Sequence, residues 1–233
     1  MCSSDLVATV VLDRILGMLG LFLVGAFTTL VPSEALDHPD LKSVRWFMWA
    51  GSVVGLVALG MMLWPRVTQS GWVQWIRRVP KVGGLAGELI EGVALFQNRP
   101  GAVWRAVLLS LVAHAGLISG FWLCARWMKQ AWTPDLATHF FFLPTAELFG
   151  AFVPVPAGMG ALEGAVQWFY ERVRPESVTE EAAGAAGFLA ALAFRLVMVG
   201  IAALGGGYYL TSRTDISAAM SPTAEPASSV SVE

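Results

Sequence analysis

Pro154-Val-Pro-Ala-Gly-Met-Gly160 lies between two apolar segments, is followed by Glu163, and decides how the chain folds. Proline removes a backbone hydrogen-bond donor and glycine loosens the backbone, so neither suits an uninterrupted membrane helix. Within lipid, irregular backbone persists only where protein buries it or water reaches it. The run therefore predicts a broken helix at membrane depth, and the carboxylate beside it marks a candidate functional site.

The composition is typical of an integral membrane protein. Hydrophobic residues make up 56% of the 233 residues and charged residues 14%, against about 25% charged in typical soluble domains. No basic patch suggests a nucleic-acid partner. The two cysteines, Cys2 and Cys124, offer no metal-ligand spacing, and we expect no disulfide, no metal and no cofactor.

Four apolar segments are long enough to cross a bilayer, which takes about 20 residues of helix. We expect spans over about residues 7–31, 46–64, 102–126 and 182–210. Two glycine pairs at GxxxG spacing permit close helix contacts and offer faces for a homo-oligomer: Gly51 with Gly55, and Gly116 with Gly120. His114 lies in the third span, where a helix–helix hydrogen bond is favoured over a proton relay.

The remaining segments do not span. Residues 136–153 carry Glu147 and are interrupted by Pro144, and residues 161–170 form only about 15 Å of helix. Together they predict a re-entrant hairpin over residues 136–170. Residues 65–101 mix basic and apolar side chains and predict an amphipathic region along the membrane. The fold class predicted is an all-α, polytopic membrane bundle with a re-entrant broken-helix hairpin.

Orientation and the chain ends follow from charge and composition. The basic region 65–101 is expected on the cytoplasmic side, which also places residues 211–233 there as a disordered tail rich in Ser, Ala, Pro and Thr. Residues 1–6 are mostly polar and read as a non-native extension. We therefore expect helices to be missing upstream.

The intramembrane charges suggest a polar cavity for the head of an amphiphile. A helix that starts after Gly160 points backbone amides at an anion, and the guanidinium of Arg14 or Arg195 suits phosphate oxygens. Carboxylates would then balance these cations or contact a cationic headgroup. The expected substrate-binding residues are Arg14, Glu147, Pro154, Pro156, Gly158, Gly160, Glu163 and Arg195.

A structural interpretation of the same charges stays open. Glu163 can cap the short helix, and Arg195 can simply neutralise a carboxylate, because buried charges are usually paired.

Three motifs resemble one family. Residues 154–163 resemble the Pro-Ile-Pro-Gly-Gly-Leu-Gly-Val-Arg-Glu signature of the flippase-like transmembrane region of lysylphosphatidylglycerol synthases. Residues 8–17 are similar to that family's segment ending in Glu-Arg, two hydrophobic residues and Gly, and residues 191–195 to its last-helix arginine motif. The resemblance runs from about residue 7 to about residue 210. The family has further helices before the Glu-Arg motif, in keeping with missing upstream helices.

The resemblance implies a multi-pass protein of the bacterial inner membrane that translocates or handles anionic or aminoacylated phospholipids. Asp13 keeps the charge of the family's glutamate, whereas Leu162 replaces the arginine that precedes the family's signature glutamate. Positive charge for an anion must then come from Arg14 or Arg195. No aminoacyl-transfer domain follows, so we expect no synthase activity.

Two alternatives to lipid translocation remain. An intramembrane transferase acting on a lipid-linked substrate would need a base or nucleophile, for which Glu163, Glu147 and His114 are the candidates. A non-transporting scaffold would use its GxxxG faces for partner helices.

Overall fold

The computed structural model describes residues 3–31, 38–68, 97, 100–130, 132–153 and 160–211, and all regular structure in these ranges is helical. The chain divides into two units, Met1–Leu192 and Ala193–Glu233. The described part of the second unit is the latter portion of one helix. The predicted amphipathic region and tail, apart from residues 65–68, 97, 100–101 and 211, lie outside the described residues.

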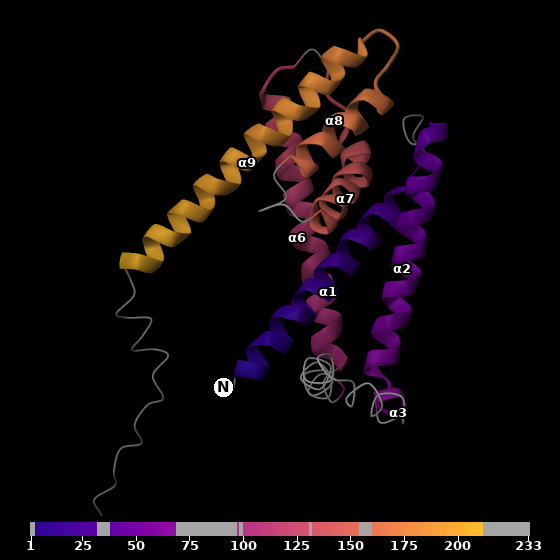
Figure 1. The fold of residues 1–233 in the computed structure, drawn as a ribbon, viewed down its shortest axis with the longest axis vertical. Coiled ribbons are helices and arrows are strands. Elements are labelled where there is room, and N and C mark those ends of the chain that lie inside the picture. The colour runs from indigo at the N-terminus through magenta and orange to yellow at the C-terminus, as the bar shows by residue number, and fades with distance from the viewer. Residues whose placement is uncertain are drawn as a thin grey trace, which may run out of the picture. The chain divides into compact units, whose positions relative to one another are not determined.

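The elements follow in chain order, and Figure 1 labels all of them except η2. They are α1 (Ser3–Thr28), η2 (Pro39–Leu41), α2 (Lys42–Leu63), α3 (Pro65–Thr68), α6 (Pro100–Trp127), α7 (Leu136–Phe152), α8 (Ala161–Val173) and α9 (Glu180–Thr211). Asp135 caps the start of α7, because its side chain accepts a hydrogen bond from the Thr138 N–H at 2.8 Å.

Three helical segments among the described residues are long and apolar enough to cross a membrane: Pro39–Leu63, Pro100–Trp127 and Glu180–Thr211. Only 17% of the most apolar window of each is buried inside the protein, so the remaining apolar side chains need lipid around them. The predicted first span forms α1, which is 26 residues long. The all-α membrane bundle expected from the sequence is confirmed.

The broken-helix hairpin is formed by α7 and α8, which pack against each other. The chain follows α7 to the break and returns along α8, so that the end of α8 lies near the start of α7 (Figure 1). With 13 residues, α8 extends about 20 Å and is too short to cross a hydrocarbon core of about 30 Å. At the turn, a methyl group on Gly150 would lie 3.8 Å from Leu162, so the two arms approach closely.

The core of the first unit surrounds α7. This helix contacts α1, α6 and α8, and its buried residues include Thr138, His139, Phe141, Phe142, Leu143, Ala146 and Leu148. Phe142 stacks on Phe169 of α8 with ring centroids 5.6 Å apart. The helix that leads into the break is therefore enclosed by protein on most of its surface.

Close contact between α1 and α2 depends on the first GxxxG pair. A methyl group on Gly51 would collide with the ring of Phe22, and one on Gly55 would lie 2.8 Å from Leu19 Cδ1. The face that Gly51 and Gly55 offer is thus used within the chain. A methyl group on Gly116 would meet nothing within 4 Å, so a homo-oligomer through the second pair stays a prediction.

We predict that Gly51→Ala lowers the free energy of unfolding in detergent by ~1–3 kcal/mol, because the added methyl group overpacks the contact with Phe22. Gly60→Ala is the matched control on the same helix, since nothing lies within 4 Å of its added methyl group. The control should be neutral or stabilising, because alanine favours helix by about 1 kcal/mol over glycine. Equal effects of the two substitutions would refute the close contact.

Candidate functional site

The hairpin carries a backbone defect that another helix repairs. Pro144 has no N–H, so the carbonyl of Phe140, four residues earlier in α7, loses its partner within the helix. The Thr28 hydroxyl of α1 has a single hydrogen, which it shares between the Val24 carbonyl at 2.8 Å and this carbonyl at 3.3 Å. The carbonyl freed by the proline is thereby partly satisfied from a neighbouring helix.

A polar pair lies one turn beyond this proline. His114 Nδ1 of α6 is 3.9 Å from Glu147 Oε2 of α7, and the two side chains are 16% and 25% exposed. His114 Nε2 lies 3.1 Å from the Gly17 carbonyl of α1. A carbonyl only accepts, so Nε2 carries hydrogen and donates. The expected helix–helix hydrogen bond of His114 is present, with the Gly17 carbonyl as its acceptor, and the other ring nitrogen faces Glu147, one of the expected site residues.

Gly20 of α1 makes room for His114. A methyl group on Gly20 would lie 2.6 Å from Ser110 Oγ and 3.1 Å from His114 Cδ2, both on α6. Gly17, one turn earlier, contributes its carbonyl to the hydrogen bond with His114, and a methyl group there would meet nothing within 4 Å. The polar pair is therefore positioned where α1, α6 and α7 meet.

The contact between the two side chains is not a hydrogen bond, because 3.9 Å is too long for one and His114 Nδ1 has no hydrogen-bond partner among the described residues. With hydrogen fixed on Nε2, Nδ1 of a neutral His114 turns a lone pair toward a Glu147 oxygen, and a proton on either atom would remove this repulsion. The arrangement offers a carboxyl group that faces an imidazole nitrogen of a neighbouring helix.

The second arm begins at Gly160, a position whose backbone conformation favours glycine over other residues. Gly160 has φ +85° and is the N-cap of α8, a conformation that L side chains rarely adopt. Its N–H donates to Glu163 Oε2 at 2.9 Å, and Glu163 is 4% exposed. The reciprocal half of a capping box cannot form, because glycine has no side chain. Glu163 therefore caps α8, as in the structural interpretation.

This cap bears on the expected anion site at α8. The carboxylate of Glu163 already brings negative charge to the helix N-terminus, where the dipole favours it. Anion binding at these amides stays a prediction.

The remaining expected residues are Arg14, Arg195, Pro154, Pro156 and Gly158. Pro154, Pro156 and Gly158 lie outside the described residues. Arg14 is exposed on α1, one turn before Gly17. Arg195 is half-buried and belongs to the second unit, so its predicted role beside the carboxylates stays a prediction.

A buried polar node at the opposite end of α7 was missed in the sequence. His139 Nδ1 lies 2.8 Å from the Asp135 carbonyl, and its Nε2 accepts from the Tyr170 hydroxyl of α8 at 3.0 Å. Aromatic rings of Phe121 and Phe142 flank the imidazole. The node fastens α8 to the start of α7. In the sequence, the only signal is a polar residue within an apolar run, and it does not indicate that His139 and Tyr170 are partners.

Comparison with known proteins identifies one family. The family model described as "Lysylphosphatidylglycerol synthase TM region" matches residues 2–206. No match was found among curated proteins or among solved structures.

We predict that Glu163→Ala lowers the free energy of unfolding by ~0.5–2 kcal/mol, as expected for loss of a helix cap. Glu163→Gln should retain most of this stability, because the amide oxygen can still accept from Gly160 N–H. Thermal unfolding in detergent measures both, with exposed Glu176 mutated to alanine as the control. A loss in Glu163→Gln as large as in Glu163→Ala would show that the charge, and not the cap, holds the residue in place.

Proposed function

Because the chain belongs to the family of the lysylphosphatidylglycerol synthase transmembrane region, we propose that it is a flippase-like protein of the bacterial inner membrane. It would translocate or handle phospholipids with anionic or aminoacylated headgroups, without covalent chemistry. By itself, membership of this family supports only the statement that the chain is a membrane protein. The lipid-handling role needs a polar place within the bundle where a headgroup can reside.

The observation that carries the proposal is the contact between His114 and Glu147 beside the broken hairpin. Ionisable side chains inside membrane bundles are costly and mark substrate or ion pathways. This pair is partly exposed, so it is not sealed in the core. Glu147 lies on α7, the helix that precedes the break, and transporters place their substrate sites at such discontinuous helices.

The charges that the structure describes near the hairpin favour one kind of headgroup. Glu147 offers a carboxylate whose partner is a titratable imidazole, and Glu163 is engaged in its cap. A carboxylate suits the ammonium group of an aminoacylated headgroup, while the phosphate would need Arg14 or Arg195. The acyl chains would stay in the bilayer while the head crosses.

The same contact gives the transferase alternative a specific basis. A carboxylate beside an imidazole can act as a general base. In that case Glu147 would accept the proton of a lipid-linked substrate, because Nε2 of His114 donates to the Gly17 carbonyl and Nδ1 faces Glu147. Transfer of lipid without any new covalent product favours translocation, and product formation without transfer favours this alternative.

We predict that Glu147→Gln slows leaflet transfer of lysylphosphatidylglycerol about tenfold or more, because the amide cannot balance the cationic headgroup. A tenfold change is equivalent to about 1.4 kcal/mol in the barrier. The assay uses proteoliposomes with acyl-labelled lysylphosphatidylglycerol, phosphatidylglycerol or phosphatidylcholine. Dithionite bleaching of the outer leaflet reports the transfer rate.

Glu176→Gln is the matched control, since it removes an exposed carboxylate in a turn. Equal transfer by the Glu147→Gln protein and the unchanged protein, with unfolding temperatures also equal, would contradict the proposal. Absence of transfer of all three lipids by the unchanged protein would do the same.

A further inference from the structure

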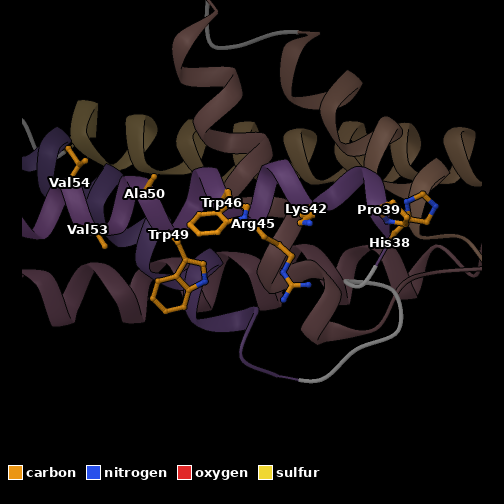
Figure 2. A pocket seen from close by; sticks show the side chains of 9 residues that line it. All are labelled: His38, Pro39, Lys42, Arg45, Trp46, Trp49, Ala50, Val53 and Val54. Carbon is orange, nitrogen blue, oxygen red and sulfur yellow. The ribbon is translucent and has the colours of Figure 1, made fainter.

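A groove of about 900 Å³ lies along one face of α2 and is not part of the site described above. Its described lining comes from η2, the residue before it, and the first half of α2: His38, Pro39, Lys42, Arg45, Trp46, Trp49, Ala50, Val53 and Val54. The members on α2 recur at intervals of three and four residues, which aligns them on one side of the helix. Figure 2 shows this face.

The chemistry of the lining changes along the helix. Nitrogen-bearing side chains of His38, Lys42 and Arg45 gather toward the start of α2, and Val53 and Val54 lie at the other end, with the two indole rings between them (Figure 2). Such an order matches an amphiphile with an anionic head and an apolar chain. Tryptophan between the two zones fits the interface between headgroups and hydrocarbon.

One wall of the groove is fixed before any ligand arrives. The Trp49 indole N–H donates to Thr29 Oγ1 of α1 at 2.9 Å. Its ring also contacts Phe27, with centroids 6.4 Å apart. Trp46, by contrast, is 70% exposed. A preset indole lowers the entropy lost on binding, and an exposed one supplies apolar area for a chain.

The acidic residue at the head of the groove is engaged elsewhere. Asp40 Oδ2 lies 3.1 Å from Arg172 Nε of α8 and 3.8 Å from His38 Nδ1. Arg172 therefore offsets the negative charge that would otherwise oppose an anion near Lys42. Lys42 and Arg45 bring two positively charged side chains to this end of the groove.

We propose that this groove binds one anionic phospholipid, with its phosphate at Lys42 and Arg45 and an acyl chain along Trp46, Trp49 and the two valines. The apolar half of the groove favours a lipid over a free phosphate ion, which would use only the basic end. The site involves neither Glu147 nor Glu163. It is thus independent of the proposed translocation.

Brominated lipids test the proposal, because bromine on an acyl chain quenches a nearby indole. The full chain in mixed micelles is titrated with brominated phosphatidylglycerol or with brominated phosphatidylcholine. We expect the anionic lipid to quench at lower mole fraction. Lys42→Gln with Arg45→Gln should weaken its apparent affinity by about 30-fold, since each of the two basic residues near a membrane surface contributes about 1 kcal/mol and about 1.4 kcal/mol corresponds to a factor of ten. Trp46→Phe with Trp49→Phe should remove the lipid-specific part of the quenching.

Arg105→Gln is the matched control: Arg105 is exposed on α6 beside exposed Trp104, and neither lines the groove. If unfolding temperature falls in the glutamine double variant, Lys42→Arg with Arg45→Lys keeps the charge and should keep the lipid preference.

Equal quenching by the two lipids in the unchanged protein overturns the proposal. A preference that survives the double glutamine substitution overturns it as well. Displacement of the lipid by millimolar glycerol phosphate would indicate a free-anion site and contradict the assignment to a lipid. None of these outcomes depends on leaflet transfer.

Discussion

The constraint on which the rest of the structure depends is that an interrupted helix within a membrane bundle must have its backbone polar groups satisfied by protein. Pro144 leaves the Phe140 carbonyl without an intrahelical donor, and the Thr28 hydroxyl of α1 shares its hydrogen between this carbonyl and that of Val24. The second arm obeys the same constraint, since Glu163 accepts from the backbone N–H of Gly160. Enclosure of α7 by α1, α6 and α8 follows, because these helices must lie close enough to reach the defects.

That enclosure explains how ionisable groups persist near the break. Glu147 contacts His114, and His114 in turn is tied to a backbone carbonyl of α1. Three helices thus meet at one group of polar side chains. Close approach of α6 to Gly20 of α1 makes this geometry possible, in the way that Gly51 and Gly55 bring α1 and α2 together. Stability and the candidate headgroup site consequently rest on the same helix contacts.

Local sequence patterns predicted much of this architecture, whereas contacts between side chains of different helices could not be predicted from them. Apolar length predicted the long helices, and the Pro/Gly run predicted the hairpin, because both signals are contained in short stretches of chain. The contact of His114 with Glu147 joins residues in different helices, and a single sequence carries no information on which helix faces which. The hydrogen bond from Thr28 of α1 to the Phe140 carbonyl of α7 could not be predicted for the same reason. The cap by Glu163 was weighed as an alternative, since its spacing from Gly160 is local.

A double-mutant cycle on Thr28→Val and Pro144→Ala tests the constraint most directly. Thr28→Val should lower the free energy of unfolding by about 1–3 kcal/mol, because it leaves a buried carbonyl without a donor. Pro144→Ala restores an N–H within α7, so Thr28→Val should cost less in that background, with a coupling of ~0.5 kcal/mol or more. Strict additivity of the two substitutions would show that Thr28 does not repair the proline defect, and would contradict the account of the buried hairpin.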